Sequence, residues 1–192
     1  MKLSKHTRAR AARHTVRIGL WAFLFAGVAS LASQTGAENI EVFGVGLVLL
    51  LVVILVGVAF DIVGVAATTA QEASLHARAA HRVFGAGHAL WLVRNVHQVA
   101  SVCNDVVGDV CGTLSGAIGV TFVLKLLHAP GELEMILGTT LMTACIAALV
   151  VGGKAFGKVL AIEHGTEIIF RIGQFLACVD GFLPFKLLLP LK

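Results

Sequence analysis

Long apolar stretches separated by short polar segments dominate this chain. Each apolar stretch has the length or the composition of a helix that crosses a bilayer, for which about 20 apolar residues are needed. In lipid, a helix satisfies all of its backbone polar groups internally. The pattern therefore predicts an all-α polytopic membrane helix bundle with about four transmembrane helices, over Ile18–Ser33, Ile40–Ala67, Val99–Leu127 and Leu133–Ile162.

The polar segments predict how the chain is threaded. Residues 1–17 form a basic leader with six Lys or Arg, and the connector 70–98 contains three Arg. The loops 34–39 and 128–132 contain neither Lys nor Arg. Because basic loops stay on the cytoplasmic side, this asymmetry places both termini and the connector in the cytoplasm of a multi-pass cell-membrane protein.

Some segments keep two interpretations. The run Ile18–Ser33 is short, so it is either a retained helix or a signal peptide, and the retained helix is favoured because no clean cleavage site follows. The connector is amphipathic and breaks near Phe84–Gly87. The bundle spans residues 18–175. Ile168, Ile169, Ile172, Phe175 and Leu176 follow helical spacing before an apolar and amphipathic tail over 176–192, which lies along the membrane or packs on the bundle.

Composition excludes several functional classes. Hydrophobic residues make up 57% of the chain and charged residues only 14%, against about 25% charged in a typical soluble domain. The net charge of +4 sits at the ends of apolar runs rather than on one polar face, so nucleic acid is not an expected partner. The lipid bilayer is the expected one.

Several charged or amide side chains fall inside the predicted spans, where a charge costs about 2.5–3.5 kcal/mol on insertion scales and marks a candidate site, and six of them lie away from the helix ends. At about 1.5 Å per residue, each lies roughly 6–17 Å from the cytoplasmic end of its helix. Neighbouring antiparallel helices would bring them to one depth. The candidate metal ligands are Asp61, Asn104, Asp105 and Asp109, and the internal counter-ions are Lys154 and Lys158.

This set of charges supports two interpretations. Carboxylates and an amide are hard oxygen ligands, which suits a cation or proton site and an ion such as Mg²⁺. Alternatively, the two lysines neutralise two of the acids in an internal salt-bridge network that sets helix register. Asp105 and Asp109 are four residues apart and are expected to share a helix face, as are the two lysines.

Small residues recur at spacings that let helices approach closely. We expect these glycines to pack helices together, more within one chain than between two copies: Gly108, Gly112, Gly116, Gly153 and Gly157. The four cysteines form no C-x-x-C pair and are expected to be small buried hydrophobic residues.

An enzymatic function is not predicted. Val106–Asp109 resembles the Gly-x-Gly-Asp motif of intramembrane aspartyl proteases, but Val106 replaces the first glycine. The connector histidines, at separations of five, seven and nine, lack the i, i+4 spacing of helical metal sites.

Three segments resemble the transmembrane domain of the CNNM (cyclin M)/CorB–CorC family of magnesium transport proteins. Phe60–Ala66 is similar to the signature that ends the family's first span, before an Arg-rich connector. Cys103–Asp109 is similar to its Gly-Asn-x-x-x-Asn segment, and Gly153–Ala161 to its Gly-Glu-x-x-Pro-Lys-x-x-Ala segment. The resemblance covers roughly residues 45–175, and Ile18–Ser33 has no counterpart.

The resemblance implies a homodimer that handles a divalent cation, Mg²⁺ or Co²⁺, but this chain departs from the family. Lys154 stands where the family has an ion-binding glutamate, and the second asparagine falls on Gly108 unless the register slips by one and Asp105 and Asp109 take both places. No segment of these 192 residues is expected to form the family's cytoplasmic regulatory domains. A lysine ammonium there would occupy the place of the ion. The expected function is thus related to cation transport, and the alternative is a non-transporting scaffold or partner subunit.

Overall fold

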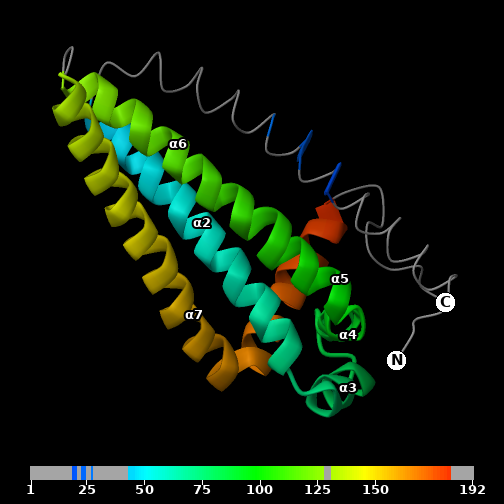
Figure 1. Cartoon of the computed structure of the whole chain (residues 1–192). Helices are drawn as coiled ribbons and strands as arrows, with labels where there is room; N and C mark the ends of the chain where they lie inside the picture. The colour runs from blue at the N-terminus through cyan, green and yellow to red at the C-terminus, as the bar shows by residue number, and fades with distance from the viewer. Residues whose placement is uncertain (1–18, 21–22, 25–26, 28–42, 128–130, 183–192) are drawn as a thin grey trace, which may run out of the picture. The chain divides into compact units, whose positions relative to one another are not determined.

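Every regular element in the described part of the chain is a helix. A computed structural model describes residues 19–20, 23–24, 27, 43–127 and 131–182. The helices follow one another without strands in these ranges (Figure 1). In order they are α2 (Phe43–Thr69), α3 (Glu72–Ala80), α4 (Ala86–Arg94), α5 (Val96–Ala100), the π-helical segment η1 (Ser101–Gly108), α6 (Asp109–Leu126) and α7 (Glu132–Phe182).

Three helical stretches among the described residues are long and apolar enough to cross a membrane: Gly46–Thr69, Val96–Leu126 and Glu132–Gly181. They correspond to the second, third and fourth predicted spans. The first predicted run, over 18–33, lies almost wholly outside the described residues, as does most of the 128–132 turn. Leader 1–17 and residues 183–192 of the predicted tail are outside them too.

The chain packs as two compact units, and the first comprises residues 1–57 and 109–149. In its described part, α6 contacts both α2 and the first part of α7. The ring of Phe122 lies over Gly46, and Gly119 and Gly138 sit in the same way under side chains across the α6–α7 contact. Buried apolar residues follow these contacts on all three helices: Leu50, Ile54, Val110, Ile118, Val123 and Ile146.

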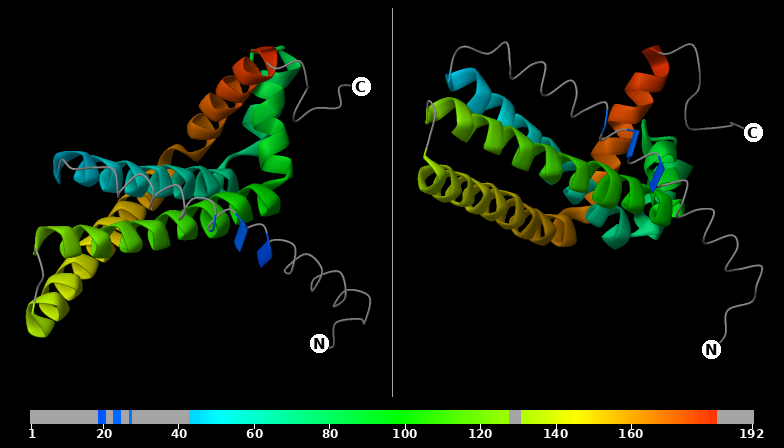
Figure 2. Two further views of the ribbon diagram at one scale, coloured as in Figure 1. Left: turned by 90° about the horizontal axis from the view of Figure 1, so that it is seen from above. Right: turned by 45° about the horizontal axis from the view of Figure 1, so that its top comes forward.

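The second unit, residues 58–108 and 150–192, holds the larger core. Here α3 and α4 pack with the last part of α7, and Figure 2 shows α4 and the end of α7 running side by side. Gly173 makes this contact close, because a Cβ there would overlap the backbone of Gly85 and Ala89. The core of this unit contains Ala66, Leu75, Ala89, Leu92, Ala161, Ile169 and Phe170.

The helix α7 is longer than the predicted last span. It continues to Phe182 and bends at His164, whose backbone (φ −119°, ψ 19°) is not helical. Beyond the bend, Ile168, Ile169, Ile172 and Leu176 pack on the core, whereas Phe175 is exposed. The structure thus has the helical spacing expected beyond Ile162, and the bend at His164 lies two residues after the end of the predicted span. The helix continues across this bend to Phe182.

The glycines that were expected to pack helices lie in different surroundings. Gly153 and Gly157 lie against α2, where Val58 and Ile62 leave no room for a Cβ. Gly112 and Gly116 face open space, and Gly119 makes the close contact on α6 instead. Of the cysteines, Cys103 and Cys111 are buried as expected, while Cys145 and Cys178 are exposed, contrary to expectation.

Candidate functional site

A buried aspartate is the centre of the candidate site. Asp61 lies on the last part of α2 and is only 5% exposed. The ammonium of Lys154 on α7 lies 3.9 Å from Asp61 Oδ1. This is an ion-pair distance but is too long for a hydrogen bond. The structure thus brings together one predicted carboxylate and one predicted counter-ion from separate apolar helices.

Asn104 reaches the same face of α2. Asp61 and Gly64 are three residues apart, so one helix face carries both. The amide of Asn104 contacts Gly64 so closely that a Cβ at position 64 would overlap it. Glycine at this position is therefore what lets the amide approach the α2 backbone.

Two buried side-chain oxygen atoms at this centre lack a hydrogen bond to the described residues. Neither Asp61 Oδ2 nor Asn104 Oδ1 has a hydrogen-bond partner among the described residues. A buried acceptor without a donor costs about 1–3 kcal/mol, and more when it is charged. The carboxylate oxygen is therefore able to bind a proton, and both oxygens are able to bind a cation or a hydrogen-bond donor. We call Asp61, Asn104 and Lys154 together the polar centre.

The segment that carries Asn104 has an unusual backbone. Ser101–Gly108 is π-helical, with hydrogen bonds between residues five apart rather than four. Such segments are often found at functional sites. Gly108, at its end, leaves space beside Lys154, because a Cβ there would lie 3.4 Å from Nζ. Sequence periodicity gave no sign of this segment.

The remaining predicted residues are placed differently. Asp105 in η1 and Lys158 on α7 are exposed. Asp109 is also exposed, and it begins α6 in the other unit. Asp105 and Asp109 were expected to share an α-helical face, but this spacing starts inside the π-helix, where residues four apart are no longer stacked.

The chemistry of the polar centre is set by its small charge. Within the described ranges, no three His, Cys, Asp or Glu side chains gather as a metal-binding group. Ca²⁺ takes six to eight oxygen ligands, and Mg²⁺ keeps several waters and binds one or two carboxylates that no ammonium neutralises. One carboxylate beside one ammonium, with a neutral amide, suits a proton or a single positive charge better. Asp61, Asn104, Asp105 and Asp109 as a joint Mg²⁺ site remain a prediction.

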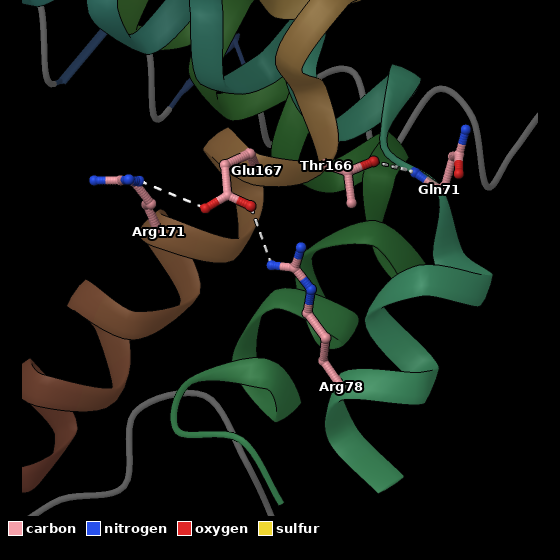
Figure 3. A network of polar contacts seen from close by, with 5 residues as sticks. All are labelled: Gln71, Arg78, Thr166, Glu167 and Arg171. Atoms are coloured by element: carbon pink, nitrogen blue, oxygen red, sulfur yellow. Dashed lines mark hydrogen bonds and ion pairs between the residues drawn. The ribbon is translucent and has the colours of Figure 1, made fainter. Parts of the chain in front are cut away.

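A second polar cluster, which sequence reasoning missed, lies where α7 bends. The Thr69 hydroxyl donates to Ala161 O (2.9 Å), and the backbone N–H of Gln71 donates to the Thr166 hydroxyl (2.9 Å). Arg78 pairs with Glu167 (3.1 Å), which also faces Arg171 (Figure 3). A groove of about 330 Å³ runs along these residues. The cluster joins the α2–α3 link to α7.

The chain matches no family model, and neither a curated protein nor a solved structure is significantly similar to it.

Proposed function

We propose that this chain is an integral membrane protein of the cation-transport type, in which the polar centre binds a proton or cation and Lys154 serves as the internal counter-ion. One observation carries the proposal. A buried aspartate faces a lysine ammonium with one oxygen, while its other oxygen and the amide oxygen of Asn104 have no hydrogen-bond partner among the described residues. A proton on the carboxylate or a cation bound by both oxygens would satisfy these acceptors.

Embedding in a bilayer is supported by what the helices expose. Only 6% of the most apolar 18-residue segment of α7 is buried inside the structure. Large apolar side chains along it face outward, Leu141 (68%), Val151 (66%) and Phe156 (75%) among them. Contact with lipid removes this surface from water, at about 25 cal/mol per Å². The basic connector would lie on the cytoplasmic side, as would both termini.

The lysine explains how such a centre could exchange a cation. At 3.9 Å, an ion pair is worth about 4 kcal/mol at an effective dielectric constant of 20. If Lys154 turns away from Asp61, the buried carboxylate needs another positive charge in its place. A proton or cation would bind at Asp61 and Asn104 in that state. Lys154 and the proton or cation would then alternate as partners of the Asp61 carboxylate, so that movement of the lysine is coupled to binding.

The proposal is tested by reversing the charge of the counter-ion. Lys154→Glu creates a second carboxylate facing Asp61, so the purified variant in detergent should bind Mg²⁺ and show a higher Tm in its presence. At an ion concentration of 100 times Kd, the stabilisation should be about 2.7 kcal/mol. Lys158→Glu is the matched control, since it makes the same charge change one turn further on, at an exposed position.

The alternative function is a membrane scaffold or partner subunit in which the Asp61–Lys154 pair has only a structural role. That alternative also follows from the observed pair, since breaking a buried ion pair costs about 3–5 kcal/mol. It predicts that Lys154→Glu is destabilised and that no tested cation restores its Tm. A Tm of Lys154→Glu that is equally low with and without Mg²⁺, together with the absence of cation flux by the wild-type protein in liposomes, would overturn the transport proposal.

A further inference from the structure

The turn between α3 and α4 presents apolar and basic side chains together on the surface. Residues 80–84 are all exposed, and they include Val83 (41%) and Phe84 (60%). His81 and Arg82 precede them directly. Phe84 has a large apolar ring that gains nothing from contact with water. His81 and Arg82 are the polar residues of the turn. Such a combination is typical of segments that lie at a bilayer surface.

The turn is held rigidly in this exposed form. Val83 N–H donates to Arg78 O (3.1 Å), and Ala86 N–H donates to Val83 O (3.1 Å). Arg82 has a left-handed backbone (φ 54°), which is uncommon for a residue with a side chain. Gly85 follows with φ 80° and lies directly on the backbone of Gln174, where a Cβ would clash. The surrounding contacts therefore force the turn outward instead of letting Phe84 fold onto the core.

The charges around the α3–α4 turn indicate that its partner is anionic. From Ala73 to Asn104 the chain has three Arg and four His but no Asp or Glu. Arg78 and Arg94 are paired with Glu167 and Glu72. Arg82, in contrast, takes part in no ion pair with any residue that the structure describes. A guanidinium without an ion-pair partner among the described residues, two positions before an exposed aromatic residue, is complementary to a lipid phosphate above an acyl-chain boundary.

We infer that the α3–α4 turn is an interfacial anchor for anionic lipid: Phe84 and Val83 enter the headgroup region while Arg82 binds lipid phosphate. The turn lies between two helical stretches able to cross a membrane, so the connector has to return to the bilayer surface on the side where it left. The inference rests on the proposed membrane embedding. It adds a lipid class and the residues that recognise it.

The test uses the full-length protein reconstituted in vesicles. Trp21 and Trp91 are the two tryptophans of the chain, so Phe84→Trp in a Trp21→Phe/Trp91→Phe background gives a single reporter at the turn. Quenching by brominated phosphatidylglycerol and by brominated phosphatidylcholine gives the relative association constant of the two lipids at residue 84. We expect strong quenching by both and a preference for phosphatidylglycerol.

Removal of one basic side chain measures its share of this preference. Arg82→Gln should lower the preference for phosphatidylglycerol at the reporter by about fivefold, which is the effect of one basic residue at an anionic surface. Arg171→Gln is the matched control, because it removes the same charge from α7, where Arg171 faces Glu167. It should leave the preference unchanged. Tm in detergent verifies that each variant is folded.

Two results separate the inference from the proposal beneath it. If the protein stays in vesicles after alkaline extraction but the reporter is quenched by aqueous acrylamide and not by brominated lipid, the anchor is wrong and the membrane protein stands. The same result would follow if the turn docked on another protein. If the chain is released by alkaline extraction, the membrane embedding is wrong as well.

Discussion

The hydroxyl of Thr69, at the end of α2, donates a hydrogen bond of 2.9 Å to the backbone carbonyl of Ala161, 92 residues further along the chain. Ala161 lies three residues before the bend at His164, whose backbone angles are not helical. The alanine is fully buried, and Thr69 supplies its carbonyl with a donor from another helix. The bend and the end of α2 are therefore parts of one arrangement.

Removal of this donor should destabilise the bend. Thr69→Val keeps the shape of the side chain but leaves the Ala161 carbonyl without its hydroxyl donor, so we expect a loss of about 1–3 kcal/mol in the free energy of unfolding in detergent. Thr68→Val is the control, since the Thr68 hydroxyl is exposed and bonds only within its own helix, to Val65 O. Equal losses in both variants would mean that the contact across the bend contributes nothing.

The close approach of Asn104 to α2 should make Gly64 intolerant of any side chain. Gly64→Ala places a methyl group where the amide of Asn104 lies, and we expect a loss of about 1–3 kcal/mol from overpacking. Asn104→Ala in the same chain should recover much of that loss. Gly152→Ala, at a position with open space, is the control for the general effect of alanine. Thermal unfolding of the four purified proteins decides the matter, and failure of the second change to rescue would contradict this contact.

The glycines of α6 should divide into two kinds. At Gly119 the side chain of Ile146 occupies the space of a Cβ, so Gly119→Ala should cost about 1–3 kcal/mol. At Gly112 the space is open, so Gly112→Ala should be neutral or stabilise by about 0.5–1 kcal/mol, because alanine is the better helix former. If Gly112→Ala instead lowers the fraction of dimer in analytical ultracentrifugation, this face packs against a second copy.

Arg78 should be more important than its exposure suggests. Its guanidinium pairs with Glu167 (Figure 3). It also lies 4.4 Å from the centre of the Phe170 ring. Arg78→Lys keeps the charge but loses the stacking, and we expect a loss of about 0.5–1 kcal/mol. Glu167→Gln, which removes the exposed ion pairs with Arg78 and Arg171, should cost less, about 0.2–0.5 kcal/mol. A larger effect for Glu167→Gln, measured by chemical unfolding, would reverse this assignment.

Hydrophobic patterning was sufficient to predict the long helices. The spans over 40–67, 99–127 and 133–162 have counterparts in α2, in α5 to α6, and in α7. The pattern is reliable here because an apolar run of this length has few alternatives to a helix. It could not show that α7 continues to Phe182, since that extension depends on the packing of Ile169 and Phe170 in the core.

The polar centre could be foreseen only in part. The cost of burying a charge marked Asp61, Asn104 and Lys154 from the sequence alone, because such residues are rare inside apolar runs. Which of the six candidates lie together depends on the tertiary structure. Lys154 pairs with Asp61, while Lys158, one turn away with the same chemistry, is exposed.

The amino-acid sequence by itself determined the helical class, the apolar lengths and the identity of the charged residues, because these follow from local composition and periodicity. Only the tertiary structure decided that η1 is π-helical, that Gly64 admits the amide of Asn104, and that Thr69 caps the carbonyl at the α7 bend. The last two of these depend on atoms from segments far apart in the chain. Their positions are set by packing, which no local pattern encodes.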